Sequence, residues 1–273
     1  MRPALLQISG TIVALLSLVT AAALSAQLLG AHPATPPVVI PTLQAPPSTF
    51  PFPQHLTLIY AVDWRVFTAG TAVFQLDQQG STERITATAD TIGATTMLFP
   101  VIDKFQSSFD IRTGCSGGFS KQLQEGRRKV SSDLTFDYAH GKQNQTERNL
   151  VKGTQKQQSA NIPACVTDSM SAIFYAASQP LVVGQKFGFP LADAMRTVTV
   201  TMKVEGKEEI KTPAGTFQTI RVQPTAEEGV VRNRGTIHIW YTDDARHMPV
   251  QIQAKLFWGT IIFHLQSFEA RSQ

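Results

Sequence analysis

Charge is missing from the N-terminal part of this sequence, since residues 3–62 contain no Lys, Arg, Asp or Glu. The chain begins Met1-Arg2, continues into an apolar run over residues 11–24 and then reaches small residues. A positive start, an apolar centre and small residues at the end are typical of a secretory signal peptide. The best cleavage site lies after Ser25, so that Ala26 would begin the mature chain and residues 1–25 would be removed.

The alternative interpretation is an uncleaved N-terminal membrane anchor, because about 20 apolar residues are enough to span a bilayer. Both interpretations place the remaining chain outside the cytoplasm, in the periplasm or on the extracytoplasmic face of the inner membrane, and secretion is a further alternative. We expect membrane association only through this segment, and only if it is retained. A lipid anchor is disfavoured because it needs a cysteine directly after the apolar run, where the sequence has none.

Cysteine is scarce, with Cys115 and Cys165 as the two thiols of the chain. An exported protein meets an oxidising compartment, in which an even number of cysteines favours bridging. We therefore expect a disulfide between Cys115 and Cys165. Two isolated cysteines without Cys-x-x-Cys or paired histidines lack the ligand spacing of a zinc site, so we expect no metal and no cofactor.

Proline is concentrated where charge is missing, because half of the chain's 16 prolines lie within residues 33–53. Proline fixes φ and removes a backbone donor, so such a segment favours extended polyproline II and acts as a semi-rigid spacer. We interpret residues 26–54 as a proline-rich linker. At about 3.1 Å per residue it would hold the following domain about 50–60 Å from its starting point. An inert leader without a partner is the alternative.

The remaining residues, 55–270, have the composition of one folded domain. The chain is 42% hydrophobic and 16% charged, which fits a globule with a substantial core. A net charge of +4 is too small to indicate a nucleic-acid partner. The basic run Arg127-Arg128-Lys129 follows Gly126 and is interpreted as a solvated hairpin tip.

Apolar side chains alternate along this region with the period of two that is typical of half-buried strands. The first strand is expected from Leu56 to Val66, with Val66 facing the core, and Ala69-Gly70 is expected to turn the chain. Short turns between successive strands predict antiparallel hairpins and an all-β fold. Further strands are predicted at residues 72–76, 85–89, 106–112, 118–124, 130–136, 145–151, 197–204, 208–211, 217–222, 236–242, 247–256 and 260–268.

One short helix is predicted near residues 168–178. Thr167 and Asp168 offer side-chain oxygens that can cap the exposed amides of a first helical turn, and apolar residues then follow at helical spacing. We prefer this capping role over a catalytic pair of nucleophile and acid, because the sequence indicates no histidine that would act as the base.

Several segments together resemble a bacterial envelope family called domain of unknown function 3108. The resemblance covers nearly all of residues 56–269, and its most specific parts are an Asp-Ser-x-Ser-Ala helix start and a Thr-Pro-Ala-Gly-Thr-Phe turn. It implies an exported antiparallel protein with a strongly curved sheet or open barrel-like sheet, and no established enzymatic activity. Where the family continues the helix into an arginine-containing segment, this chain has Ala-Ala-Ser-Gln at residues 176–179. The quoted segments are residues 60–62, 69–72, 168–175, 184–185, 212–217, 239–244 and 248–250.

Three functional hypotheses follow. The first is a noncatalytic module that binds an apolar or amphiphilic envelope molecule, such as a lipid or a lipoprotein acyl chain, because concave sheets lined with aliphatic and aromatic residues suit such ligands. The second is a structural or assembly component acting through a protein or envelope glycan, for which Phe257 and Trp258 are the candidate contact surface.

The third hypothesis is a hydrolase. It is the weakest of the three, and we therefore expect no catalytic residues. Its candidates would be Asp243, Asp244 and His247, or His238 and His264 on adjacent strands. Neighbouring aspartates are better explained as a turn, and the two histidines lack a third ligand for zinc.

Overall fold

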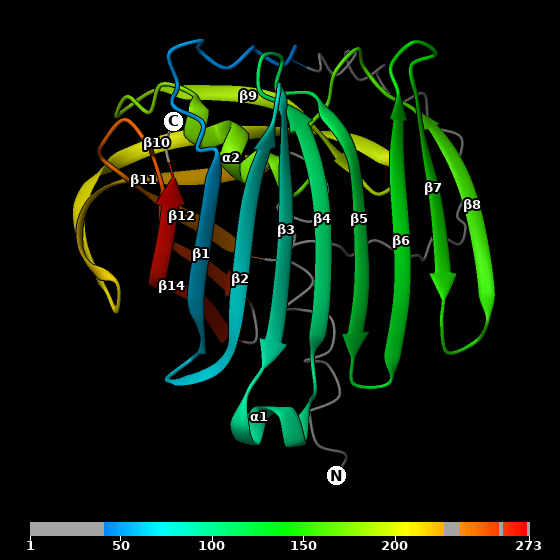
Figure 1. The fold of residues 1–273 in the computed structure, drawn as a ribbon, viewed down its shortest axis with the longest axis horizontal. Helices are drawn as coiled ribbons and strands as arrows, with labels where there is room; N and C mark the ends of the chain where they lie inside the picture. The colour runs from blue at the N-terminus through cyan, green and yellow to red at the C-terminus, as the bar shows by residue number, and fades with distance from the viewer. Residues whose placement is uncertain (1–40, 227–234, 257–258, 272–273) are drawn as a thin grey trace, which may run out of the picture.

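The computed structural model describes residues 41–226, 235–256 and 259–271, and within them the strands form a single antiparallel sheet (Figure 1). The sheet has 14 strands in the order β8-β7-β6-β5-β4-β3-β2-β1-β14-β13-β12-β11-β10-β9, so β8 and β9 lie at its two edges. The predicted all-β, antiparallel and open fold is confirmed. The strands are β1 (His55–Trp64), β2 (Phe67–Gln79), β3 (Thr82–Thr91), β4 (Ile102–Asp110), β5 (Ser116–Glu125), β6 (Arg128–Asp137), β7 (Lys142–Asn149), β8 (Thr154–Asn161), β9 (Lys186–Asp193), β10 (Arg196–Thr212), β11 (Gly215–Ala226), β12 (Thr236–Thr242), β13 (Pro249–Leu256) and β14 (Gly259–Arg271).

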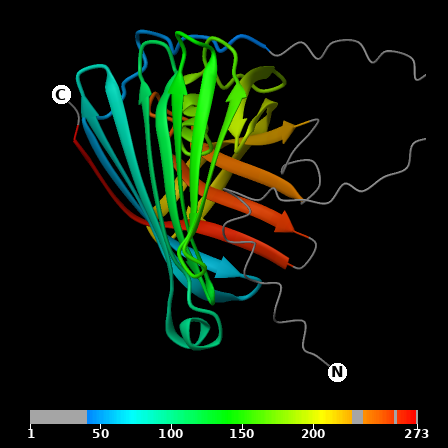
Figure 2. The same ribbon diagram turned by 90° about the vertical axis from the view of Figure 1, so that its right-hand side faces the viewer.

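The topology consists of two meanders that are joined by one long-range strand pair. Strands β1–β8 follow one another as hairpins, and β9–β14 form a second series. The first and last strands, β1 and β14, pair antiparallel along their whole length and make the two series one sheet. Figures 1 and 2 show the second series crossing behind the first, so that the sheet curves around a common interior.

Helix α2 (Ser171–Ser178) connects the two meanders and fills one end of this interior. Seven of its eight residues are buried. Three fully buried tyrosines also occupy the core, and their hydroxyls donate to backbone carbonyls: Tyr60 to Pro249 at 2.6 Å, Tyr175 to Gln44 at 2.8 Å and Tyr241 to Ile173 at 2.9 Å. Because each buried hydroxyl has a partner, the rings can be buried without the cost of an unmet polar group.

The first hairpin differs from the prediction. The turn lies at Arg65 and Val66, and not at Ala69-Gly70, which are part of β2. Arg65 has a φ of 58°, and Val66, predicted to face the core, is 96% exposed. The alternation of inward-facing and outward-facing residues therefore ends at Trp64, before the chain reverses at Arg65 and Val66.

A second helix, α1 (Gly93–Leu98), replaces the irregular stretch between β3 and β4, and none of its residues is buried. Strands β8 and β9 were not predicted either. β8 has the sequence Thr-Gln-Lys-Gln-Gln-Ser-Ala-Asn, which contains no large apolar residue to alternate, and β9 contains Pro190, which an edge strand tolerates. The two strands predicted at 197–204 and 208–211 are one strand, β10, with a register shift between Val204 and Gly206.

The second half of the predicted linker, residues 41–54, lies on the domain, which corrects the boundary at residue 54. Leu43 is 7% exposed and belongs to the main core cluster. The carbonyl of Gln44 accepts a hydrogen bond from the Tyr175 hydroxyl at 2.8 Å, and the Phe52 ring lies 5.8 Å from the ring of Phe109. The prolines keep this segment extended, and its apolar side chains hold it across the α2 end of the molecule.

Candidate ligand-binding site

One end of the curved sheet is sealed by a hydrogen-bond network around Asp168. This carboxylate is fully buried directly before α2. Its Oδ2 accepts hydrogen bonds from the hydroxyls of Ser107 at 2.7 Å and Ser116 at 2.5 Å, and its Oδ1 accepts from the amides of Met170 at 2.8 Å and Ser171 at 3.1 Å. Burial raises the pKa of Asp168, while these four hydrogen bonds act in the opposite direction. Asp168 therefore fastens α2 to β4 and β5.

A disulfide reinforces the same end. Cys115 and Cys165 are bonded across a sequence separation of 50 residues, which ties the β4–β5 turn to the segment before α2. Gly114 beside it has a φ of 78°, and a Cβ there would lie 2.7 Å from Leu43 and 2.8 Å from Tyr175. The turn, the N-terminal segment and α2 thus pack tightly enough to leave no space for a side chain at residue 114.

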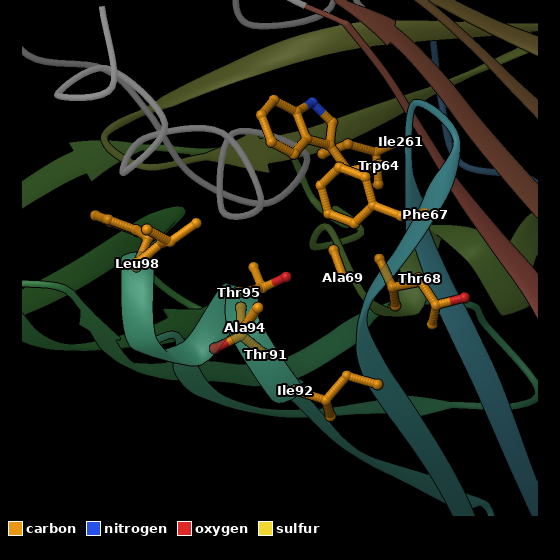
Figure 3. Close-up of a pocket in the computed structure, with 13 residues that line it drawn as sticks. Trp64, Phe67, Thr68, Ala69, Thr91, Ile92, Ala94, Thr95, Leu98 and Ile261 are labelled. Carbon is orange, nitrogen blue, oxygen red and sulfur yellow. The ribbon is translucent and has the colours of Figure 1, made fainter. Parts of the chain in front are cut away.

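The opposite end holds a cavity of about 440 Å³, within the size range of small-molecule sites. Figure 3 shows Trp64, Phe67 and Ile261 on one side of it and the α1 residues Ala94 and Leu98 on the other. The lining is almost entirely apolar. The lining residues are Val62, Trp64, Phe67, Thr68, Ala69, Thr91, Ile92, Gly93, Ala94, Thr95, Leu98, Phe99 and Ile261.

The shape of this pocket depends on an aromatic contact in its wall and on hydrogen bonds at the base of the loop that contains α1. The rings of Trp64 and Phe67 meet edge to face at 5.4 Å. The base of the α1 loop is closed by a hydrogen bond from the Thr91 amide to the Val101 carbonyl at 3.1 Å and by the Val101 amide to Thr91 Oγ1 at 3.0 Å. α1 consequently projects as a loop that is held at its base and carries apolar residues on its inner side.

Carboxyl groups lie in the interior beyond Phe99, which packs against the β5–β6 turn at Gly126. Asp103 and Glu125 are buried, and each has one oxygen without a hydrogen-bond partner among the described residues. Burial and the neighbouring Glu125 raise the pKa of Asp103 to about 8. Burial also raises the pKa of Glu125, although Arg128 bonds its other oxygen at 2.9 Å. The apolar pocket therefore has a polar region near one of its walls.

The structure places the remaining predicted residues as follows. Thr167 does not cap the helix: its hydroxyl donates to the Pro190 carbonyl at 3.0 Å, so it joins the segment before α2 to β9. Asp168 supplies the contacts to the first-turn amides described above. Ser25 and Ala26 of the cleavage site, and Phe257 and Trp258 of the candidate contact surface, lie outside the described residues.

The aspartates proposed as catalytic candidates lie in a turn between β12 and β13. Asp243 forms an ion pair with Lys207 at 2.6 Å. Asp244 accepts from Arg246 at 2.6 Å, and its pKa is lowered by this and neighbouring hydrogen bonds against the opposing effect of burial. His247 Nδ1 lies 2.6 Å from the carbonyl of Ala177 in α2.

The two histidines are not on adjacent strands, because β13 lies between β12, which carries His238, and β14, which carries His264. His238 Nε2 lies 3.3 Å from Glu205, and His264 Nε2 lies 3.5 Å from Asp63. Each histidine thus faces a different carboxylate. Across the described residues, no group of three or more His, Cys, Asp or Glu side chains has the arrangement of a metal site. No helix in the described part of the chain is long and apolar enough to cross a membrane.

The sequence profile of a family described as protein of unknown function, DUF3108, matches residues 59–266. The chain belongs to the DUF3108 family. The match includes β2–β13, parts of β1 and β14, α1, α2, the disulfide and all residues of the apolar pocket. No functionally curated protein matches the sequence of this DUF3108 protein.

Three solved structures are similar to this chain at low sequence identity. A beta-barrel-like protein of the domain of unknown function DUF1849 from Brucella abortus superposes with a TM-score of 0.57 at 10% identity, over 81% of this chain and 100% of that one. A protein described as exported, with a YmcC-like fold, from Bacteroides fragilis has a TM-score of 0.37 at 10% identity, over 81% and 99% of the two chains. A protein described as a lipoprotein from Parabacteroides distasonis has a TM-score of 0.33 at 12% identity, over 81% and 97%. The first of these supports the barrel-like fold of the DUF3108 protein.

Proposed function

We propose that this DUF3108 protein is a noncatalytic extracytoplasmic module that holds an apolar or amphiphilic envelope molecule in the pocket beside α1. The observation that carries the proposal is the difference between the two ends of the curved sheet. One end is sealed by α2, Asp168 and the disulfide, whereas the other retains an apolar cavity of about 440 Å³.

The lining favours hydrocarbon over a polar ligand. Trp64, Phe67, Leu98 and Ile261 would exclude water from a bound chain, and each methylene transferred from water to such a site contributes about 0.8 kcal/mol. The carboxyl groups of Asp103 and Glu125 are buried near the Phe99 wall and do not line the cavity, so the lining itself matches the hydrocarbon part of an amphiphile. This lining supports a lipid or a lipoprotein acyl chain as the ligand class.

An extracytoplasmic location agrees with two features. The uncharged leader over residues 1–25 has the pattern of an export signal or anchor. A disulfide that closes a long loop forms and persists in oxidising compartments. A noncatalytic role is supported by the ion pairs of Asp243 and Asp244, which tie one carboxylate to Lys207 in β10 and the other to Arg246 in the same turn.

The proposal can be tested by filling the pocket. Ala94 lines the pocket from α1 and is exposed, so Ala94→Trp should occupy the cavity without disturbing the core. Ala139, an exposed alanine in the β6–β7 turn at the sealed end, provides the matched control Ala139→Trp. The probe is N-phenyl-1-naphthylamine, an apolar fluorophore, displaced by palmitate and by a lysophospholipid.

We expect A94W to weaken probe binding by at least about 10-fold and A139W to leave it unchanged, since about 1.4 kcal/mol of lost contact corresponds to that factor. Native mass spectrometry of the chain from Ala26, purified without detergent, should also show a copurified amphiphile that A94W loses. Equal probe binding by A94W and the unaltered protein, together with a ligand-free mass, would refute the proposal and favour the structural alternative.

A further inference from the structure

Exposed apolar side chains are gathered at the α1 end of the molecule. Eight of the eleven large apolar side chains that are exposed among the described residues belong to this end. They lie in the β1–β2 turn, in α1 and its flanks, and in the β7–β8 turn, which all fall on the same side because the strands between them alternate in direction (Figure 1). The eight are Val66, Phe67, Ile92, Met97, Leu98, Ile102, Leu150 and Val151.

Several of these side chains do not serve the pocket. Val66, Met97 and Val151 are 96%, 84% and 62% exposed, and none of them lines the cavity. Each such residue alone is ordinary on a protein surface, but clustering at the tips of successive turns marks an interaction surface. Their exposure therefore needs an explanation separate from ligand binding in the pocket.

Cations accompany the apolar tips. Arg127 lies in the β5–β6 turn, Lys129 follows it at the start of β6, Lys152 lies in the β7–β8 turn, and all three are exposed. The β5–β6 turn touches the α1 loop, because the Gly126 amide donates to the Pro100 carbonyl at 2.8 Å, and it continues to the β7–β8 turn, where the Leu150 amide donates to the Lys129 carbonyl at 2.9 Å.

The turns at this end, residues 65–66, 92–101, 126–127 and 150–153, contain no Asp or Glu. Asp90, near the end of β3, is an exposed carboxylate close to them. The turns are consequently basic as well as apolar, with the cations in the same turns as the exposed side chains or directly beside them.

We infer that this α1-end surface, formed by Val66, Met97, Leu98, Ile102, Leu150 and Val151 together with Arg127, Lys129 and Lys152, docks on the surface of an anionic lipid bilayer. Apolar side chains beside lysine and arginine match the interface of such a bilayer, where the side chains enter the headgroup region and the cations meet anionic headgroups. Pro41, where the described chain begins, lies beside Gly188 in β9 at the α2 end, away from this surface.

Apart from Leu98, which also lines the cavity, the residues of this surface are not part of the pocket, so docking and ligand binding can fail separately. Substitutions of Val66, Val151 and the three cations leave the lining of the cavity intact. If both proposals hold, a ligand drawn from the bilayer would enter the pocket past α1 without crossing bulk water.

Vesicle flotation tests the inference, using the chain from Ala26, which keeps every described residue and removes the apolar leader that would itself enter a bilayer. The vesicles are equal parts phosphatidylglycerol and phosphatidylcholine, or phosphatidylcholine alone. The charge variant is R127Q/K129Q/K152Q, and its control with the same net charge is R112Q/K142Q/K186Q, whose exposed cations lie away from the α1 end. The apolar variant is V66S/V151S, and its control is V182S/V183S, which removes two valines that are 50% and 46% exposed between α2 and β9.

We expect the unaltered chain to bind the anionic vesicles, with an affinity that falls as salt is raised from about 50 to 300 mM. The charge variant should bind about 100-fold more weakly, because each cation near an anionic surface contributes about a fivefold factor. The apolar variant should lose about fivefold or more, and both controls should bind as the unaltered chain does. Absence of vesicle binding, equal binding to phosphatidylcholine alone, or equal losses in the variants and their controls would each overturn the inference.

Discussion

Replacing Asp168 is the most direct test of whether its hydrogen bonds keep the α2 end of the curved sheet closed. Its carboxylate is fully buried and receives four hydrogen bonds, from two serine hydroxyls of β4 and β5 and from two amides at the start of α2. In Asp168→Ala, the Ser107 hydroxyl and the two amides would lose this partner in a region closed to water, whereas the Ser116 hydroxyl would keep its longer bond to the Ser108 carbonyl at 3.4 Å.

The expected cost follows from what each donor loses. A buried donor left without a partner costs about 1–3 kcal/mol, so the sum for the three donors is about 3 kcal/mol or more. Asp168→Asn should cost less, about 1–2 kcal/mol, because its oxygen still accepts from the amides of Met170 and Ser171 while its NH₂ group can donate to the oxygens of Ser107 and Ser116. Ser107→Ala, which removes one donor together with its bond, should cost about 1 kcal/mol.

Urea unfolding followed by tyrosine and tryptophan fluorescence gives these free energies, and the probe N-phenyl-1-naphthylamine reports new apolar surface at the α2 end. We expect the order D168A, D168N, S107A from most to least destabilised, with extra probe binding in D168A alone. A cost of D168A below about 1 kcal/mol, or equal costs for D168A and D168N, would show that the network around Asp168 does not hold α2 in place.

Two further predictions concern the buried acid of β3 and the disulfide. Burial and the nearby Asp77 raise the pKa of Glu83 from 4.5 to about 8. Between pH 5 and pH 8 the folded state therefore keeps a proton on Glu83 that the unfolded state has released. The free energy of unfolding should consequently fall as the pH rises from 5 to 8. Glu83→Gln should reduce this fall by at most about 1.4 kcal/mol per pH unit, and an unchanged pH slope in urea unfolding would contradict the assignment. Replacing Cys115 and Cys165 with serine should lower the unfolding free energy by about 4 kcal/mol, because the bond closes a loop of 50 residues, and equal denaturation midpoints for variant and oxidised protein would argue against this.

The local patterns predicted much of the fold because they depend on neighbours in sequence. Alternation from Leu56 to Val62 follows from the twofold period of a strand with one buried face, and the structure buries all four alternating residues. The Thr-Pro-Ala-Gly-Thr-Phe turn at residues 212–217 likewise joins β10 to β11, as proline and glycine at those positions favour. Strand β8 escaped prediction because an exposed polar edge strand has no apolar face to produce a pattern.

The pocket was less accessible to sequence reasoning. Trp64 and Ile261 are almost 200 positions apart, and only the pairing of β1 with β14 sets them opposite each other. Phe67 and Leu98 are large apolar residues, which sequence alone would predict to be buried. Their exposure beside a cavity follows from the positions of the turns in the structure. A signal did exist in the run Thr-Met-Leu-Phe at residues 96–99, which is apolar without strand periodicity.

The sequence by itself determined that the chain carries an uncharged leader, a proline-rich segment and one antiparallel β domain, since composition and periodicity are local properties. The tertiary structure decided that the proline segment from residue 41 onward packs on the domain, that α2 seals one end through Asp168, and that the cavity lies at the other end beside α1. These features depend on contacts between residues far apart in the chain, and such contacts are fixed by the closing of β1 onto β14 and not by any single segment.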